Sequence, residues 1–501
     1  MKSGQRMIRF GAGMRDEVHP SEFGNKAASL ATMALMGVPV PPGFSLSVSV
    51  CEEYYRNNRK IPDDFSTLLK GGIEFIEKAS GSVFGGIRRP LLVSVRSGAP
   101  VSMPGVMDTI LNVGLNRETL RGLIFLSGNP RFAWDTYRRF IAEFARVIFR
   151  QDLQPYHMAL RTLLDAEGVA DPIELNSRSL KDLALQYERI FTSGTGRRFP
   201  SDVQEQLVCA AEGVIRSWTN PRAESFRRMN LLKEVRGTAV TVQMMVFGNM
   251  GARSGAGVAF TRNPWLGSGD LLIDFKFGAQ GEDVVSGEQS AATQQEFARA
   301  MPEVFDSLLD IGKRLELHYR DMQDLEFTVE EGRLSVLQTR SGKRSPYAAL
   351  KIAVSLCQEG IIAPSDVIWM LREVDLDAIR VQTVKPGDYP VAVGIPASGG
   401  VASGMIALSG ERAEREAGEG NPVILVRETA SPDDLPGISA ACGLLTMRGA
   451  RTSHAAVVAR QMGKICVVQC EGLEIDTARK RCRLSGHELR EGSLITIDGN
   501  S

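Results

Sequence analysis

The chain has 501 residues, of which 43% are hydrophobic. Because a single hydrophobic core stops growing at roughly 250–300 residues, we expect two or three domains. Lys and Arg together equal Asp and Glu in number, 59 of each, which excludes a global basic field of the kind that binds nucleic acids or anionic membranes.

Five histidines and seven cysteines are few for this length. An odd number of cysteines without the spacing of a small disulfide scaffold predicts reduced thiols. Cys466 and Cys470 form a suggestive pair, but no second Cys or His pair stands nearby at ligand spacing, so we expect no metal site there. No apolar run is typical of a signal peptide or reaches the ~18 residues of a membrane span, so we expect a cytoplasmic protein.

Residues 1–345 are expected to form one α+β unit, because Gly-rich turns and β-branched runs alternate with long helical stretches. The sequence FGNKAASLATM places Lys26 in a glycine-containing turn before a helix. VSVRSGA places Arg96 at the end of a strand, ahead of a Gly/Pro loop over residues 102–105 that can fold over phosphates. Most loops of this composition are simple turns, so the loop alone does not define a site.

A helical subdomain is expected within this unit, over residues 116–199. Its apolar residues recur at helical spacing, as in FAWDTYRRFIAEFARVIF, and strand signals are few. Two apolar strands follow, one with Gln243 and Met244 in VTVQMMVFGNMG and one with Asp274 in DFKFGAQG. Ordinary core strands and turns can show both patterns, but we favour contact with a ligand.

The segment DLEFTVEEGRLSVLQTRSGKR predicts a β-hairpin around Glu331, Gly332 and Arg333. If those three residues form the loop, Asp324 faces Arg340 and Glu326 faces Gln338, and all four side chains share one face of the sheet. Carboxylate and amide oxygens suit Mg²⁺, and a guanidinium suits phosphate. A hairpin with charges on a solvated face would show the same pattern.

After residue 345 the sequence pattern changes from that of the first unit to a linker and a second domain. Residues 346–393 begin with a strong helix that Gly360 ends and continue as a charged, irregular stretch, which we interpret as a linker and hinge. Residues 394–501 contain small-residue turns and four strand candidates with helices between them, and predict a second, compact β-rich domain.

The sequence TMRGARTSHAAVVARQMGK places His454 at the opening of a helix, after a strand and a glycine-containing turn. Unpaired backbone N–H groups and the positive end of the helix dipole lower the pKa of a histidine there and favour an attached phosphoryl group. A neutral imidazole can attack phosphorus, so this place suits a nucleophile. A histidine that only caps or packs would occupy the same position.

The residues around His454 resemble the phosphohistidine motif of the phosphoenolpyruvate-utilising enzymes, Gly-Gly-x-Thr-Ser-His-Ala-Ala-x-x-Ala-Arg. The match runs from Thr452 through Arg460, and Ala450 replaces the second glycine. The triplet Thr-Ser-His is most similar to that of the pyruvate, phosphate dikinases, and the resemblance extends over essentially the whole chain. Around Lys26 the family has Gly-Gly-Lys-Gly, where Asn25 and Ala27 stand here.

This resemblance implies an α+β multidomain protein: an ATP-grasp nucleotide-binding domain with a helical insertion, followed by a small β/β/α swivelling phosphohistidine domain. The nucleotide-binding residues it implies are Lys26, Arg96, Gln243, Met244, Asp274, Asp324, Glu326, Gln338 and Arg340. The metal ligands are Glu326 and Gln338, and the catalytic residues are His454, Arg96 and Arg340. Thr452, Ser453 and Arg451 flank the phosphohistidine, and Arg451 is a charge that can meet phosphoryl oxygens.

The reaction implied by the resemblance uses Mg²⁺ as cofactor and ATP and inorganic phosphate as substrates. They would phosphorylate His454 and release AMP and pyrophosphate, and transfer to pyruvate would then give phosphoenolpyruvate on a (β/α)₈ barrel that these 501 residues do not include. Two alternatives stay open: a phosphohistidine kinase for another acceptor, and a non-catalytic nucleotide-binding regulatory protein. The latter is favoured only by the changed residues Asn25, Ala27 and Ala450. We expect neither nucleic-acid nor membrane partners.

Overall fold

The computed structural model shows a chain that divides into two units. Unit 1 comprises Met1–Val246 with Ser335–Gln338, and unit 2 comprises Phe247–Leu334 with Thr339–Ser501. The structure describes all residues except 1–4, 12, 15–16, 102, 104–106, 170, 230–235, 282–291, 293, 377–378, 380–383, 385–388, 431–433, 450, 452–455, 457, 460–461 and 501.

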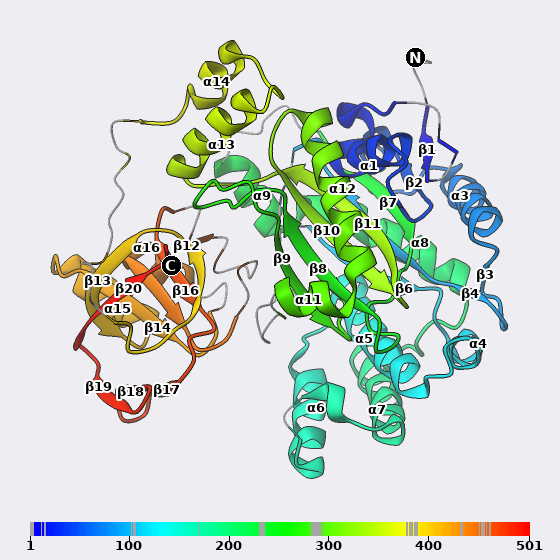
Figure 1. Cartoon of the computed structure of the whole chain (residues 1–501). Coiled ribbons are helices and arrows are strands. Elements are labelled where there is room, and N and C mark those ends of the chain that lie inside the picture. Colours follow the sequence, from blue (N-terminus) through cyan, green and yellow to red (C-terminus); the bar gives the residue numbers. More distant parts are fainter. Residues whose placement is uncertain are drawn as a thin grey trace. The chain divides into compact units, whose positions relative to one another are not determined.

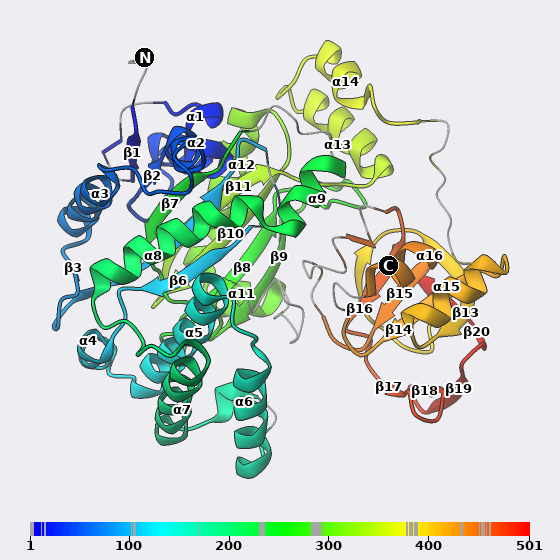
Figure 2. The ribbon, with the colours of Figure 1, turned by 180° about the vertical axis from the view of Figure 1, so that it is seen from behind.

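Unit 1 is built on a five-stranded antiparallel sheet (Figures 1 and 2). In spatial order its strands are β1 (Met7–Phe10), β2 (Gly43–Leu46), β7 (Ala239–Met244), β5 (Val93–Gly98) and β6 (Thr109–Val113). A short parallel pair, β3 (Val83–Phe84) and β4 (Pro90–Leu91), stands apart. The helices around this sheet are α1 (Pro20–Leu35), α2 (Val48–Arg56), α3 (Phe65–Ser80), α8 (Val203–Arg216) and α9 (Pro221–Met229).

The two faces of this sheet carry different helices. Val95 pairs with Val242 and Ile110, and on this face Ile110 lies close to Gly213 of α8. Arg96 pairs with Thr241 and therefore points to the opposite face, because successive side chains of a strand alternate. α1 covers that opposite face, where a Cβ on Gly98 would lie 3.6 Å from the carbonyl oxygen of Phe23.

Between β6 and α8 the chain is helical. Asn116 caps the first of these helices through a capping box with Thr119. The helices are α4 (Arg117–Ser127), α5 (Pro130–Phe149), α6 (Gln154–Glu167) and α7 (Ser177–Thr195), with a 3₁₀ turn at Pro172–Glu174. Edge-to-face contacts of Phe199 with Phe140, Phe144 and Phe191 join α5 to α7.

A four-stranded antiparallel sheet lies mostly in unit 2, in the order β11 (Arg333–Ser341), β10 (Gln323–Glu330), β8 (Gly255–Phe260) and β9 (Leu272–Phe277). α11 (Gln294–Ala300) and α12 (Pro302–Tyr319) cover one face, where Phe297 contacts Phe275 and Phe327 (Figure 1). α13 (Pro346–Gln358) packs on the other face and leads to α14 (Pro364–Leu371). The predicted helix end is confirmed, because Gly360 has a φ of 75° just after α13.

An ion network around one buried arginine ties this sheet to its helices. Arg262 follows β8 and is 4% exposed, and its guanidinium contacts Glu316 of α12 at 2.8 Å and Glu359 after α13 at 2.6 Å. Both carboxylates accept two bonds from the guanidinium, a geometry that compensates for the loss of water around a buried charge.

This network predicts a pH-dependent stability. The hydrogen bond from Arg262 lowers the pKa of Glu359 from 4.5 to about 2. A carboxyl whose pKa is lower in the folded state stabilises the fold above about 4.5 and loses this effect as the pH falls toward about 2. We therefore expect Glu359→Gln to be less stable than the wild type at pH 6, with a difference that shrinks between pH ~4.5 and ~2. Urea midpoints measured along this range test it.

The exposed carboxyl of Glu303 in α12 offers a matched control, and Glu303→Gln should show no such convergence with the wild type. A stability difference between the wild type and Glu359→Gln that stays constant from pH 6 to pH 2 would contradict the prediction.

The remainder of unit 2 has three layers. A six-stranded mixed sheet lies in the middle, with parallel pairing from β13 through β16 and antiparallel edge strands. In spatial order it contains β12 (Ile395–Ser398), β16 (Ile465–Val468), β15 (Gly443–Thr446), β14 (Val423–Arg427), β13 (Val401–Ala407) and β20 (Leu494–Asp498).

Successive side chains of β14 point alternately toward the two outer layers. Leu425 belongs to a core shared with α15 (Gly410–Gly418) and α16 (Leu435–Ala440). Ile424 and Val426 point the other way. There they face the three-stranded sheet of β17 (Leu473–Asp476), β18 (Arg481–Leu484) and β19 (His487–Arg490).

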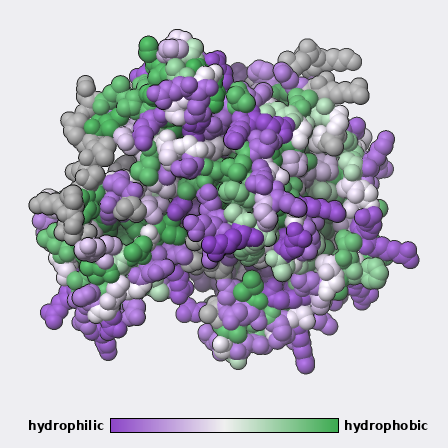
Figure 3. Space-filling model, viewed as in Figure 1, coloured by the Kyte–Doolittle hydropathy of each residue, from purple (hydrophilic) through white to green (hydrophobic). Residues whose placement is uncertain are grey.

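Among the described residues, no helix is long and apolar enough to cross a membrane. Hydrophilic and hydrophobic side chains are interspersed on the face that Figure 3 shows.

Candidate functional site

A kink in α1 brings the turn before Lys26 to the end of β5. Gly24 has φ 78° and ψ 158°, which are not helical, and a Cβ there would lie 1.9 Å from the carbonyl oxygen of Gly98. The next residue, Asn25, donates its backbone N–H to the carbonyl of Ala99 at 3.1 Å. Only glycine permits this backbone conformation and this close approach. The predicted glycine-containing turn is thus a kink within one helix.

Lys26 and Arg96 therefore lie on two segments of unit 1 that contact each other. Both side chains are half-buried, and Arg96 points to the face of the sheet that α1 covers. The structure brings together two of the cations that the sequence assigns to phosphate binding. In the loop predicted over residues 102–105, only Met103 is among the described residues, and it is buried.

Gln243 and Met244 lie on β7 in different environments. Gln243 is 1% exposed and donates its amide N–H to the carbonyl of Pro41 at 3.1 Å. Met244 is half-exposed, and its backbone N–H donates to Pro42 at 3.0 Å. A buried amide must be hydrogen-bonded, so Gln243 has a structural task, and its contact with a nucleotide stays a prediction.

In unit 2, strand register places three carboxylates on one face of the four-stranded sheet. Val258 of β8 pairs with Asp274 on one side and with Glu326 on the other. Two residues along the same strand, Phe260 pairs with Asp324. Because side chains repeat every second residue, the three acidic residues share this face.

Arg340 lies at this acidic face. Its Nε atom is 2.8 Å from Oδ2 of Asp324, which confirms the predicted partnership across the hairpin. Burial acts to lower the pKa of Arg340, but Asp324 and Glu326 outweigh it and the pKa is raised. The side chain remains 37% exposed, so this cation is held in place beside Asp324 and is still within reach of a ligand.

The hairpin turn differs from the prediction. Its loop has two residues, Glu331 and Gly332, because Arg333 already belongs to β11. Both loop residues have positive φ, 48° and 79°, as a type I′ turn requires. The assumed three-residue loop was wrong; the shorter loop was not predicted because glutamate rarely adopts a positive φ.

The proposed metal ligands lie on neighbouring strands, Glu326 on β10 and Gln338 on β11, and both are half-buried. Within the described part of the chain, no group of three or more His, Cys, Asp or Glu side chains could hold a metal ion by itself. One carboxylate and one amide oxygen nevertheless fit Mg²⁺, which usually takes one or two protein oxygens and completes its shell with water and phosphates.

His454, Thr452 and Ser453 lie outside the described residues. Around them, β15 ends at Thr446, Gly449 has a φ of 138°, and Ala456 and Ala459 are helical and fully buried. This order agrees with the predicted strand, glycine turn and helix.

Arg451 is half-buried, and its guanidinium carbon lies 5.8 Å from the ring centroid of Trp265. Burial lowers the pKa of Arg451, and Asp274 acts in the opposite direction. A guanidinium stays protonated in proteins, and we predict that the charge of Arg451 flanks the phosphohistidine.

Two protein-family descriptions match the chain. "Pyruvate phosphate dikinase, AMP/ATP-binding domain" matches residues 59–305, and "PEP-utilising enzyme, mobile domain" matches residues 419–501. The chain belongs to the pyruvate, phosphate dikinase family. The dikinase resemblance of the sequence is thereby confirmed, together with a mixed helix and sheet architecture in several domains.

Curated dikinase relatives are similar over nearly the whole chain. "Pyruvate, phosphate dikinase 2" of Zea mays is 42% identical over 506 residues, which cover 100% of this chain and 57% of the relative. "Pyruvate, phosphate dikinase" of Clostridium symbiosum is 41% identical over 484 residues, which cover 96% and 55%. The chain thus spans about half the length of the relatives it matches. Several plant relatives carry "chloroplastic" in their names, so the expected cytoplasmic location stays a prediction.

Lys343 is a functional candidate that the sequence analysis did not identify. It follows β11 and keeps an exposed side chain. Loss of surrounding water lowers its pKa, Arg340 lowers it further, and Asp324 acts in the opposite direction. The signal in the sequence was a second basic residue, three positions after Arg340 in TRSGKR.

Proposed function

We propose that this chain is the nucleotide-binding and phosphohistidine part of a pyruvate, phosphate dikinase-type phosphotransferase. ATP and inorganic phosphate phosphorylate His454, with release of AMP and pyrophosphate. The observation that carries the proposal is the sheet face that holds Asp274, Asp324 and Glu326 with Arg340, in a chain matched by an AMP/ATP-binding and a mobile domain.

We further propose an ATP-grasp fold for residues 1–345, with the helical subdomain at 116–199, a linker and hinge at 346–393, and a swivelling domain at 394–501. Antiparallel sheets in both units and the helices α4–α7 support this division. For the hinge, Pro386 and Gly387 lie outside the described residues.

Each set of residues has a task in phosphoryl transfer, which depends on alignment and charge neutralisation more than on covalent help from the protein. Lys26 and Arg96 neutralise nucleotide phosphates, and Arg340, oriented by Asp324, binds phosphoryl oxygens through two parallel N–H groups. Glu326 and Gln338 hold Mg²⁺, which neutralises charge that develops on the phosphates.

The first step forms a bond between an imidazole nitrogen of His454 and the β-phosphorus of ATP. The bond from that phosphorus to the oxygen bridging to the α-phosphate breaks, and AMP leaves. In the second step an oxygen of inorganic phosphate attacks the terminal phosphorus of the pyrophosphorylated histidine, and pyrophosphate leaves. Thr452, Ser453 and Arg451 flank the phosphohistidine that remains.

Pyruvate is the acceptor we propose, bound by a (β/α)₈ barrel outside these 501 residues. The relatives that carry pyruvate in their names are nearly twice as long as the matched region, which supports this assignment. Another acceptor would leave the chemistry at His454 unchanged, and loss of label from the phosphorylated chain on addition of each candidate acceptor would identify it.

Exchange of labelled AMP into ATP tests the first step without any acceptor. We expect the wild type with Mg²⁺ to catalyse this exchange and His454→Ala to show none, because the nucleophile is missing. His487→Ala is the matched control, since His487 is an exposed histidine on β19. ATP binding without exchange in the wild type would favour the regulatory alternative.

A further inference from the structure

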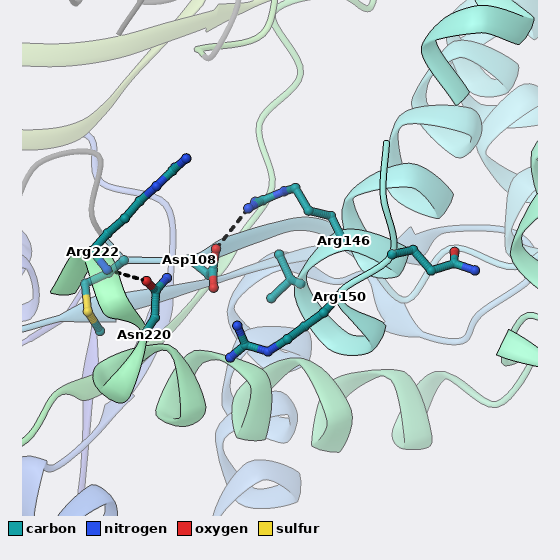
Figure 4. Close-up of a pocket in the computed structure, with 8 residues that line it drawn as sticks. Asp108, Arg146, Arg150, Asn220 and Arg222 are labelled. Atoms are coloured by element: carbon teal, nitrogen blue, oxygen red, sulfur yellow. Dashed lines mark hydrogen bonds and ion pairs between the residues drawn. The ribbon is translucent and has the colours of Figure 1, made fainter. Parts of the chain in front are cut away.

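Unit 1 contains a polar cavity of about 410 Å³ that the proposed function does not use (Figure 4). It lies where the end of α5, the residues before β6 and the start of α9 meet. Its lining residues are Met107, Asp108, Arg146, Val147, Arg150, Gln151, Asn220 and Arg222.

The cavity and the predicted phosphate site lie on opposite faces of the sheet. Arg96 pairs with Thr109 and points to the face that α1 covers. Asp108 precedes Thr109 and binds Arg146 of α5 at 3.0 Å, and α5 packs against β6. Ile110, on the same side, lies against α8. The cavity is therefore a separate site.

Arg146 is fixed at the wall of this cavity. Its guanidinium binds Asp108 at 3.0 Å and Glu143 at 2.7 Å. Burial acts to lower the pKa of Arg146, but Glu143 and Asp108 outweigh it, and the pKa is raised. In Figure 4 the Asp108–Arg146 pair lies between the guanidinium ends of Arg150 and Arg222.

Arg150 and Arg222 differ from Arg146, because both side chains are exposed. Neither guanidinium has an ion pair or hydrogen bond to the part of the chain that the structure describes. Gln151, in contrast, is engaged with Tyr156 at 2.6 Å. Three arginines against the single carboxylate of Asp108 leave the lining with two positive charges in excess. Such a lining favours an anion.

We propose that this cavity binds a small phosphate-bearing anion, with Arg150 and Arg222 as its ligands. Guanidinium groups match phosphate oxygens through paired N–H donors. The volume is at the lower end of the ~300–1,000 Å³ typical of small-molecule sites, so there is room for more than one phosphate group. Only Met107 and Val147 are apolar in the lining, which suits a ligand that is polar throughout.

Protection from phenylglyoxal, mapped by mass spectrometry of peptides, tests this site directly. Separate arms contain inorganic phosphate, pyrophosphate or AMP, and so distinguish a free phosphate, a linked pair and a phosphate ester. We expect at least one of these anions to slow modification of Arg150 and Arg222 by about tenfold or more at saturation. Arg161, an exposed arginine of α6, should react at an unchanged rate. Unchanged rates at Arg150 and Arg222 in all three arms would overturn the proposal.

Calorimetry with the protecting anion gives a second readout. The double variant Arg150→Gln/Arg222→Gln should bind it at least about tenfold more weakly or lose one binding site per chain, since both charged ligands of the anion are removed. Arg161→Gln should bind as the wild type does. Equal affinity and stoichiometry in all three proteins would refute the site. Neither readout requires phosphorylation of His454, so failure of the proposed function leaves this test intact.

Discussion

Arg340→Gln should slow the exchange of AMP into ATP by about 10²–10³-fold, because it removes the guanidinium that Asp324 orients at the acidic face. Arg340 is held in position before the reaction, so it stabilises the charge of the transition state without any rearrangement. Its removal therefore raises the barrier directly. Arg340→Lys should recover part of the rate, because it restores the charge but not the paired N–H donors.

Arg333→Gln is the matched control for this prediction. Arg333 begins the same strand, β11, and has an exposed side chain. Exchange by this variant should stay within about twofold of the wild type, since the removed charge is solvated. If Arg340→Gln also exchanged at nearly the wild-type rate, while urea midpoints showed all variants folded, Arg340 would have no part in phosphoryl transfer.

Gly24→Ala is expected to destabilise unit 1 by at least about 2–3 kcal/mol, because this backbone conformation is nearly restricted to glycine. The added Cβ would also lie 1.9 Å from the carbonyl oxygen of Gly98, and backbone on both sides must move to relieve that contact. Displacement of α1 from β5 would carry Lys26 away from Arg96. We therefore expect weaker ATP binding in addition to a lower urea midpoint.

Gly81→Ala separates the cost of the backbone conformation from the cost of the close contact with Gly98. Gly81 ends α3 with a φ of 70°, and nothing lies within 4 Å of a Cβ placed there. This variant should cost only about 1 kcal/mol, the ordinary penalty for alanine at positive φ. Should Gly24→Ala prove no more destabilising than Gly81→Ala, the close packing of the kink against β5 would not exist.

Local patterns predicted much of the second half of the chain. The charges of the hairpin indicated that Asp324 meets Arg340, and the ion pair is present although the loop has two residues instead of the three assumed. The glycine after β15 and the buried helical residues Ala456 and Ala459 likewise follow the order read from the sequence.

Contacts between distant segments could not be predicted in this way. The network of Arg262 with Glu316 and Glu359 joins three elements, and no periodicity connects them. Tertiary packing also decided that Gln243 is buried against Pro41, where the sequence left open whether it faces a ligand. The kink at Gly24 was not predicted, because it depends on contact with β5, which is distant in the sequence.

Labelling with ATP tests the central claim most directly. With β-labelled ATP and Mg²⁺, we expect acid-labile, base-stable label on His454, at close to one site per chain, and none in His454→Ala. With γ-labelled ATP the chain should carry label until inorganic phosphate is added and then release it as pyrophosphate. Label on another residue, or label that persists in His454→Ala, would contradict the account.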